Sequence, residues 1–279
     1  MPWLSCPNCA TAMALSGDRM TCETGHAFDV ARQGYVSLLR GDHKGGTADT
    51  AAMVEARAAF LAAGHYAGIA ALAARLGTPA LDAGGPRNCA VDLGAGTGYY
   101  LAKVLDASDG THAGLALDVS KFAARRAARA HPRIGSVVAD AWQSLPIRGR
   151  AASLVLNVFA PRNPAEMHRI LRPDGRAVVI APEPAHLAEL VAAHGLLNVD
   201  ERKRERIVTQ FAGRFEIEAE QVYGTVLSLA PEQAASLVDM GPNAWHAASR
   251  SGAVPGGGTP GQPRIEVTVA VRAYVLRPI

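Results

Sequence analysis

Residues 91–98 read VDLGAGTG, which is an apolar run broken by an acidic residue and followed by glycines at positions 94, 96 and 98. Because glycine has no Cβ, three glycines in five residues let the backbone turn tightly and lie directly against a ligand. A loop of this kind after a buried strand is typical of cofactor sites in open α/β sheets. The stretch therefore predicts an α/β fold with a Rossmann-like sheet.

The loop departs from the dinucleotide fingerprint G-x-G-x-x-G at its last position. Counted from Gly94, that fingerprint needs a third glycine at position 99, where this chain has Tyr99. The third glycine gives close helix–strand packing in dinucleotide-binding folds, so its replacement disfavours a nicotinamide oxidoreductase. The pattern favours the first loop of an S-adenosylmethionine (SAM) methyltransferase, where the backbone approaches the methionine part of the cofactor.

Strands and helices alternate on both sides of this loop, as expected for a parallel, doubly wound sheet. The predicted strands are 89–93, 112–117, 136–139, 152–159 and 176–181. The predicted helices between and after them are 99–105, 121–130, 166–171 and 187–194. Runs such as SLVLNVFA and AVVIA are apolar throughout, which suits strands that are buried on both faces.

Three regions follow from this pattern: a zinc-binding RNA-recognition module at 1–40, a helical linker at 41–80 and a SAM-dependent methyltransferase domain at 81–279. Residues 41–47 read as a connector, and helices are expected at 49–63, capped by Thr47 or Asp49, and at 69–76. Late strands at 215–229 and 265–276 suit an antiparallel hairpin at the end of the sheet. Residues 254–263, VPGGGTPGQP, read as a low-complexity loop.

Composition sets broad limits on the class of protein. The chain has 279 residues, of which 49% are hydrophobic, so it can bury a substantial core. No run of about 18 apolar residues is present, and the first residues do not resemble a signal peptide, so a cytoplasmic protein without a membrane span is expected. The formal charge of +3 only weakly favours an anionic partner.

The four cysteines point to a metal rather than to disulfides in such a chain. Cys6 and Cys9 form a C-x2-C pair, and Cys22 and His26 follow as C-x3-H. Zinc takes four nitrogen or sulfur ligands, and four protein ligands leave no open position, so we expect a structural zinc ion. His43 and His65 are alternatives to His26 as the fourth ligand. The remaining cysteine, Cys89, is expected to be a buried strand residue.

Acidic residues end three of the predicted strands, at the edge of the sheet where such folds bind ligands. Asp118 could accept both ribose hydroxyls of a cofactor, which favours SAM or NAD over NADP, and Asp140 with Ala141 lies where an adenine amino group could be read. Asp92 is expected near the methionine amine. The predicted cofactor-binding residues are Asp92, Gly94, Gly96, Thr97, Gly98, Tyr99, Asp118, Asp140 and Ala141.

The segment after the fourth strand, 157–164, reads NVFAPRNP and occupies the usual position of the methyl acceptor. It lacks the Asn/Asp-Pro-Pro motif of many enzymes that methylate planar amines. Asn157 could hold a base edge, and Arg162 could stabilise an anion that develops on a carbonyl oxygen. These two residues are the candidate catalytic residues.

Several basic clusters accompany the cysteine-rich module, which favours RNA as the partner, bound first through its phosphates. They are Arg32, Arg40, His43 and Lys44; Arg125, Arg126, Arg129, His131 and Arg133; and Arg202, Lys203, Arg204 and Arg206. A small-molecule methyltransferase, or one acting on another RNA such as tRNA, is the alternative. A non-catalytic RNA-binding protein is disfavoured because the cofactor loop and its acids are intact.

The chain also resembles a known family over nearly its whole length. The CPNC…C-x3-H module followed by FDVARQGYVSLL, then MVEARAAFLAAGHY, VDLGAGTGYY, LDVSK and NVFAPRNPAE, is similar to the RlmA-type large-subunit ribosomal RNA guanine-N1 methyltransferases. NVFAPRNP and the ARQGYV context lean toward the tylosin-resistance (TlrB-like) type within that family.

The resemblance implies a specific activity. A zinc module would help to recognise a 23S rRNA hairpin lining the peptide exit tunnel, and the SAM-dependent domain would methylate N1 of one guanine, with macrolide resistance as a consequence. It also implies that Asp118 is the ribose-binding acid and that 157–162 faces the acceptor. A homodimer is plausible if the zinc module and catalytic domain grip different parts of the hairpin.

Overall fold

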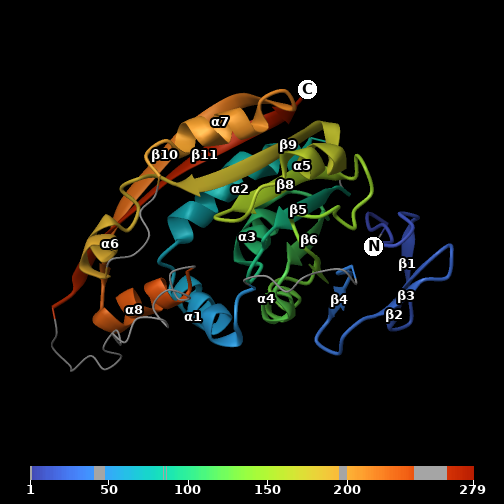
Figure 1. Ribbon diagram of the computed structural model, residues 1–279, viewed down its shortest axis with the longest axis horizontal. Coiled ribbons are helices and arrows are strands. Elements are labelled where there is room, and N and C mark those ends of the chain that lie inside the picture. The colour runs from blue at the N-terminus through green and yellow to red at the C-terminus, as the bar shows by residue number, and fades with distance from the viewer. Residues whose placement is uncertain (1, 41–47, 84, 86, 195–199, 242–262) are drawn as a thin grey trace.

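The computed structural model describes residues 2–40, 48–83, 85, 87–194, 200–241 and 263–279. Its centre is an eight-stranded sheet in the order β10-β11-β9-β8-β5-β6-β7-β4 (Figure 1). The six strands from β9 to β4 run parallel, five of them as predicted, and β10 and β11 are antiparallel. The predicted connector at 41–47, and all but the last residue of the predicted loop at 254–263, lie outside the described residues.

The parallel strands are β5 (Cys89–Leu93), β6 (Ala113–Asp118), β7 (Ile134–Val138), β8 (Ala152–Val158) and β9 (Leu171–Pro182). Every residue of β5 and β8 is buried, which explains their continuous apolar sequences. The helices between and before them are α1 (Ala51–Ala62), α2 (Ala67–Asp82), α3 (Tyr99–Ala107), α4 (Lys121–Ala127) and α5 (Pro164–Ile170).

Several predicted element ends were wrong because local hydrogen bonds decide them. The helix predicted at 49–63 begins at Ala51, since the Thr50 side chain, and not that of Asp49, accepts from the Met53 N–H; the other predicted cap, Thr47, lies outside the described residues. The helix predicted at 121–130 ends at Ala127, whereas that predicted at 69–76 runs from Ala67 to Asp82. The strand predicted at 176–181 begins at Leu171, where the helix predicted at 166–171 has already ended.

The N-terminal module forms a small separate sheet of β1 (Met13–Ser16), β2 (Arg19–Cys22) and β3 (Ala27–Asp29). It is joined to the main sheet by β4 (Tyr35–Ser37), which pairs in parallel with β7 and was not predicted. The module also contacts the segment before β8, since Leu4 bridges Ile147 and the Ser5 N–H donates to the Pro146 carbonyl. The module is therefore bound to the sheet by both backbone pairing and packing.

The C-terminal part forms the expected hairpin of β10 (Phe215–Leu229) and β11 (Ile265–Pro278). Helices α6 (Ala188–His194) and α7 (Lys203–Phe211) precede it, and α8 (Pro231–Asp239) follows β10. Helix α6 was predicted, but α7 and α8 were missed. In Figure 1, α8 lies beside α1, far along the chain from it.

Two buried clusters, one on each face of the sheet, form the core. One joins α1, α2, α3 and α8 to the sheet, and the other joins the N-terminal module, α5 and α7 to its opposite face. No single helix among the described residues is long and apolar enough to cross a membrane; only α1 and α2 together pass that test, and they are bent by 83°.

Candidate zinc centre and cofactor cavity

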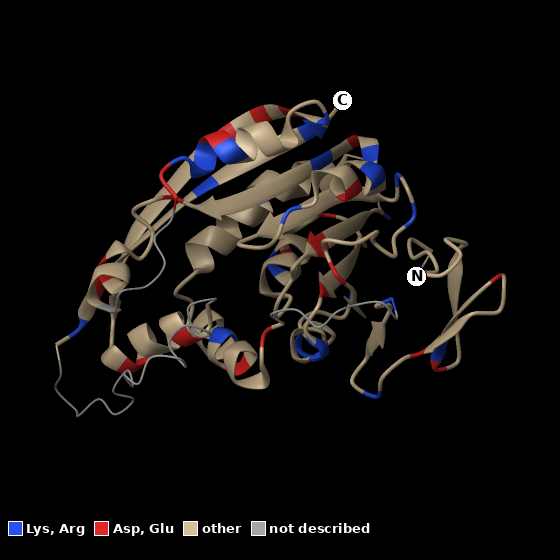
Figure 2. Cartoon of the chain, in the orientation of Figure 1, with Lys and Arg blue, Asp and Glu red and all other residues tan. Residues whose placement is uncertain are grey.

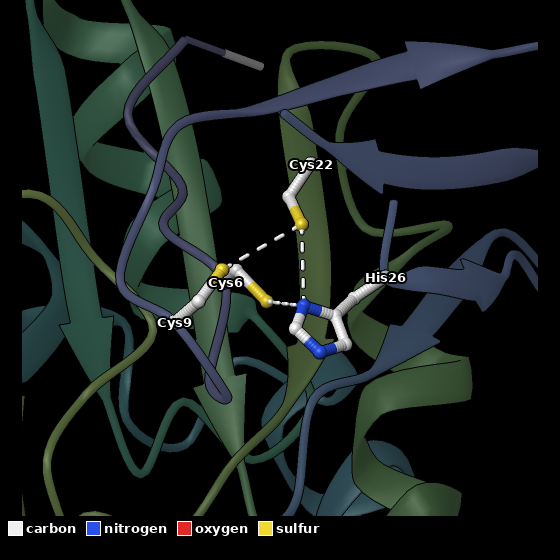
Figure 3. Close-up of side chains that lie close together, drawn as sticks. All are labelled: Cys6, Cys9, Cys22 and His26. Carbon is white, nitrogen blue, oxygen red and sulfur yellow. Dashed lines mark hydrogen bonds between the residues drawn. The ribbon is translucent and has the colours of Figure 1, made fainter. Parts of the chain in front are cut away.

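The four residues predicted to bind zinc lie together. Cys6 and Cys9 come from the turn before β1, Cys22 ends β2, and His26 precedes β3. Their ligand atoms all lie within 4.8 Å of one another, and Figure 3 shows the three sulfurs and the ring nitrogen turned toward one another. Three thiols and one imidazole around a common centre fit a tetrahedral zinc ion with no open position.

Threonine hydroxyls around the sulfurs favour the thiolate form that zinc requires. The Thr24 hydroxyl lies 3.0 Å from the Cys9 sulfur and 3.2 Å from that of Cys22. Hydrogen bonds from Thr11 and Thr24 lower the pKa of Cys9 to about 7, and Thr24 lowers the pKa of Cys22 to about 5. Hydroxyl donors that stabilise thiolate charge are a common second layer around metal ligands.

The alternative ligands lie elsewhere. His65 packs against the Phe60 ring at 4.7 Å between centroids, in the connection between α1 and α2. His43 lies outside the described residues. Cys89 is buried in β5, as expected for a strand cysteine. His26 is therefore the histidine that completes the cluster.

A cavity of about 570 Å³ opens at the carboxyl ends of the parallel strands, beside the glycine loop. Its walls come from the loop after β5, the turns after β8 and β9, and helices α1, α7 and α8. Asp92, Gly94, Gly96, Thr97 and Arg162 line it, together with the unpredicted Ala95 and Tyr100. The predicted site residues Gly98, Tyr99, Asp118, Asp140, Ala141 and Asn157 are not among its lining residues.

Asp92 is the most unusual residue of the cavity wall. Its side chain is 1% exposed, and its Oδ2 has no hydrogen-bond partner among the described residues. Burial, with a smaller contribution from Asp118, raises the pKa of Asp92 to about 8. A buried carboxylate without a partner is costly unless a cation joins it. Its position at the cavity fits a bound ammonium group.

The glycine loop is held by the neighbouring strand. The Gly94 and Ala95 N–H groups both donate to the Leu117 carbonyl at 2.9 Å, and the Gly96 N–H donates to Asp118 Oδ2 at 2.9 Å. Gly94 has a φ of +70°, and a Cβ there would lie 2.5 Å from that of Ala160. Glycine is therefore required where the cofactor loop meets the turn after β8.

The strand-end acids Asp118 and Asp140 hold the backbone of the loops that follow them. Asp118 Oδ1 also accepts from the Ser120 N–H at 2.8 Å, so both of its oxygens already hold backbone. Asp140 Oδ1 accepts from the Trp142 N–H at 2.9 Å, beside a Trp142 side chain that is 65% exposed. These contacts fix the loops after β6 and β7.

The two candidate catalytic residues occupy different positions. Asn157 is fully buried in β8, and its Nδ2 donates to the carbonyls of Leu93, at 3.3 Å, and Pro161, at 2.8 Å. It therefore joins the two loops that border the cavity without lining the cavity itself. Arg162 does line it, and its Nε donates to Gln210 Oε1 at 3.2 Å. Burial and the neighbouring Arg206 lower the pKa of Arg162.

Sequence reasoning missed several residues of the cavity wall. Tyr66, Phe159 and His186 form an aromatic group, with Phe159 and His186 stacked at 5.5 Å between ring centroids. Lys203 also lines the cavity and has no ion-pair partner among the described residues. Usable signals were NVFAPRNP for Phe159, MVEARAAFLAAGHY for Tyr66 and the basic cluster at 202–206 for Lys203, whereas His186 comes from a segment that carries no motif.

Helix α8 closes another side of the cavity, where Leu237, Val238 and Met240 line it. Arg57 of α1 connects the two helices, because its Nη2 donates to the Met240 carbonyl at 2.5 Å and its Nη1 pairs with Asp49. The same guanidinium lies over Gly96, so α1 and α8 together cover the glycine loop.

The glycine loop, strand-end acids and parallel sheet, together with the four-ligand cluster, define a SAM-dependent methyltransferase that carries a zinc ribbon. Residues 4–46 match the family model described as RlmA, N-terminal, a zinc ribbon. The chain is 48% identical over 282 residues to the 23S rRNA (guanine(748)-N(1))-methyltransferase of Streptomyces fradiae, covering 99% of this chain and 97% of the relative. It belongs to the 23S rRNA guanine-N1 methyltransferase family.

Two further relatives carry the same type of name, given provisionally. A 23S rRNA (guanine-N(1)-)-methyltransferase of Micromonospora griseorubida is 44% identical, over 100% of this chain and 98% of the relative. Another from Bacillus subtilis (strain 168) is 32% identical, over 66% of each chain. The similarity therefore extends across both the zinc ribbon and the methyltransferase sheet.

Proposed function

We propose that this protein transfers a methyl group from SAM to N1 of a single guanine in 23S rRNA, the guanine numbered 748 in the name of the S. fradiae relative. The observation that carries the proposal is the similarity to that relative over 99% of the chain. Asp92 Oδ2, which is buried beside the glycine loop and has no hydrogen-bond partner among the described residues, supports the cofactor independently. The target lies in a hairpin near the peptide exit tunnel.

The predicted cofactor-binding residues, in the cavity wall and beside it, divide between the parts of SAM. Asp92 pairs with the ammonium of the methionine part, and the backbone of Gly94, Gly96, Thr97, Gly98 and Tyr99 lies against that part. Asp118 accepts the ribose hydroxyls through the lone pairs that Gly96 and Ser120 leave free. Asp140 and Ala141 flank the adenine. Replacing Asp118 with Ala should weaken SAM binding and loosen the loop.

The chain's own groups prepare guanine N1, which carries a proton and is a poor nucleophile until that proton is lost. When bound, SAM would supply an electrophilic methyl group to N1, and the N1 proton would pass to water. Arg162 and Lys203 place two positive charges at the acceptor end, which favour the deprotonated base. Asn157 acts as a positioning residue that holds the acceptor loop against β5.

The zinc ribbon and the basic surface recognise the RNA. Residues 1–40 act as the recognition module, 41–80 as the linker and 81–279 as the methyltransferase domain, and the enzyme works in the cytoplasm on ribosomal RNA. A homodimer would let a ribbon and a cavity from different copies grip one hairpin. Light scattering with and without a hairpin RNA tests that arrangement, since a monomer in both states excludes it.

The activity is tested with tritiated SAM and 23S rRNA that lacks the modification, followed by primer extension. We expect one stop at the guanine that corresponds to position 748. Transfer to a different guanine would correct the target, and no transfer despite measurable SAM binding would contradict the proposal. Expression in a macrolide-sensitive host tests the consequence for resistance, which should appear only with the active enzyme.

A further inference from the structure

The turn after β9 holds His186 in one orientation. Three hydrogen bonds, at 2.7–3.2 Å, bind this turn to β11. Two join backbone groups, the Glu183 N–H to the Ala270 carbonyl and the Leu187 N–H to the Thr268 carbonyl, and in the third the Ala270 N–H donates to His186 Nδ1. The imidazole is therefore fixed by its Nδ1 atom, and the opposite edge of the ring, with Nε2, faces Tyr66 at the cavity.

The contact with Ala270 also fixes the tautomer. An N–H can only donate, so Nδ1 must offer its lone pair, and a neutral ring then carries its hydrogen on Nε2. Burial and the nearby Lys203 lower the pKa of His186 to about 4, so the ring is neutral at pH 7. His186 is consequently a hydrogen-bond donor at Nε2 and cannot accept a proton there.

The contact between His186 and Tyr66 leaves the Tyr66 hydroxyl hydrogen without an acceptor among the described residues. His186 Nε2 lies 3.5 Å from the Tyr66 hydroxyl, so the Nε2–H can donate only to the Tyr66 oxygen. The Tyr66 hydroxyl hydrogen then has no acceptor among the described residues. Burial raises the pKa of Tyr66, so this hydroxyl stays protonated. The pair therefore contains two donors, His186 Nε2–H and the Tyr66 O–H, and one acceptor, the Tyr66 oxygen. The Ala270 N–H of β11 sets the direction of both hydrogen bonds, because it fixes the histidine tautomer.

The surroundings of the pair suit a flat, unstacked base. Phe159 stacks on His186, is 38% exposed, and has a φ of +55°. A left-handed backbone is costly for an aromatic residue, and such strain persists where surrounding contacts enforce it, commonly at functional sites. Enzymes that modify a base within structured nucleic acid bind it unstacked, against aromatic side chains and with its edge hydrogen-bonded.

We infer that the Tyr66–His186 pair donates a hydrogen bond to O6 of the target guanine and selects a carbonyl at that position. The inference rests on the proposed function, since it concerns the same acceptor site. A carbonyl oxygen satisfies the unused donor, whereas the amino group found at that position in adenine would bring a second donor against it. The same hydrogen bond strengthens as N1 loses its proton and charge moves to O6.

The test compares binding of two hairpin RNAs without SAM, one with guanosine and one with 2,6-diaminopurine at the target position. These bases differ at position 6, which is a carbonyl in guanine and an amino group in 2,6-diaminopurine, and at N1, which carries a hydrogen only in guanine; the His186 variants separate the two differences, because only the group at position 6 is proposed to meet the Tyr66–His186 pair. The wild-type protein should prefer the guanosine hairpin by about tenfold or more, since a site with a fixed donor rejects a second donor. In His186→Asn, the Tyr66 hydroxyl is free to accept, so the preference should fall below about threefold.

A second variant separates chemistry from packing. His186→Gln keeps an N–H donor near the Nε2 position, so the preference for guanosine should return, and methyl transfer should exceed that of His186→Asn by about tenfold. His168→Asn is the matched control, because His168 contacts Phe215 and the Ile279 carbonyl and does not line the cavity. It should keep the wild-type preference.

Circular dichroism shows whether each variant is folded, and calorimetry measures the affinity of the folded variants for SAM. The inference is overturned if folded His186→Asn retains the guanosine preference, or if His186→Gln fails to restore it. It is also overturned if His186→Asn weakens SAM binding as much as RNA discrimination, because the pair would then face the cofactor. Failure of the proposed function would appear separately, as a wild-type protein that binds SAM but does not methylate 23S rRNA.

Discussion

The zinc ribbon and the cofactor cavity are formed by different kinds of residue sets. All four zinc ligands come from a 21-residue stretch between Cys6 and His26, and short turns bring them together. The cavity takes its walls from Arg57 to Gly241, that is, from both halves of the chain. Local spacing is therefore enough to specify the metal centre, whereas the cavity exists only when distant segments have assembled.

The two regions also treat charge differently. In the ribbon, hydroxyl donors lower the pKa of Cys9 and Cys22, so the site is prepared for a cation by polar contacts. In the cavity, burial raises the pKa of Asp92, so its charge is stabilised only when a cation enters. Neighbouring hydroxyls thus stabilise the charge in the zinc ribbon, whereas only a bound cation would stabilise the charge of Asp92 in the cavity.

Loss of the metal should have the largest effect and should separate the two regions. Replacing Cys6 and Cys9 with Ser should remove zinc and lower RNA methylation by about 100-fold or more, because the binding free energy of structural zinc is folding free energy. SAM affinity should change by less than about threefold, because the cavity shares no residue with the ribbon. Zinc analysis and SAM calorimetry measure the two effects.

Cys89→Ala is the matched control for this pair, since Cys89 lies in β5 and outside the ligand cluster. It should retain one zinc ion per chain. Unchanged zinc content in the Cys6 and Cys9 variant would refute the ligand assignment, and equal loss of RNA methylation and SAM binding would show that the two regions are not independent.

Asp92→Asn should weaken SAM binding and stabilise the protein in the absence of SAM. SAM affinity should fall by about 10- to 100-fold as the ammonium loses its partner, while the free energy of unfolding without SAM should rise by about 1–3 kcal/mol. The folded-state pKa of Asp92 is raised from 3.8 to about 8, so its contribution to stability is present below pH 4 and is lost as pH rises toward 8.

Denaturant unfolding at several pH values measures this effect. Relative to Asp92→Asn, the wild-type protein should lose stability between about pH 4 and pH 8. Asp109→Asn, in the exposed turn after α3, should alter neither SAM affinity nor the pH dependence. A parallel pH dependence in wild type and Asp92→Asn would contradict the assignment of a strained buried carboxyl.

Gly94→Ala tests how closely the cofactor loop and the acceptor loop meet. The new Cβ combines a positive φ with an overlap against Ala160, so unfolding free energy should fall by about 2–4 kcal/mol. Adding Ala160→Gly should remove the overlap, so that a loss of about 1–2 kcal/mol in unfolding free energy remains from the backbone strain alone. Gly213→Ala, with a φ of +75° and nothing within 4 Å, should show the backbone cost alone. Equal losses in Gly94→Ala and Gly213→Ala would contradict the close approach.

The smallest effect is expected on the surface. Arg125, Arg126 and Arg129, at the end of α4, are exposed and without a described ion pair, and Figure 2 shows basic residues gathered there. Changing each to Gln should weaken RNA binding by roughly threefold and reduce its salt dependence, with SAM binding unchanged. Arg204→Gln is the control, because Arg204 already pairs with Glu220. An equal loss of RNA binding in Arg204→Gln would contradict a specific role for the surface at the end of α4 in RNA binding.

The parallel part of the fold could be predicted from the sequence because buried strands leave a strong pattern. The apolar runs of β5 and β8, the glycine loop and the strand-end acids all depend on residues close together in the chain. The short strand β4 could not be predicted, since three residues carry no periodicity and only pairing with β7 makes them a strand. Helices α7 and α8 were missed although their sequences carry local signals, since α8 begins with Pro231 and Glu232 in its first turn and both helices bury apolar residues at helical spacing.

By itself, the sequence indicated the zinc ligands and the cofactor class, because each depends on spacing within a short segment, and it indicated the family through motifs spread along nearly the whole chain. Only the tertiary structure decided which polar groups share the cavity. It separated Asn157, which joins two loops, from Arg162, which lines the wall, and it brought Tyr66 to His186 across 120 residues. Hydrogen-bond direction depends on such distant partners, so the edge of the base that this enzyme recognises is a property of the folded chain.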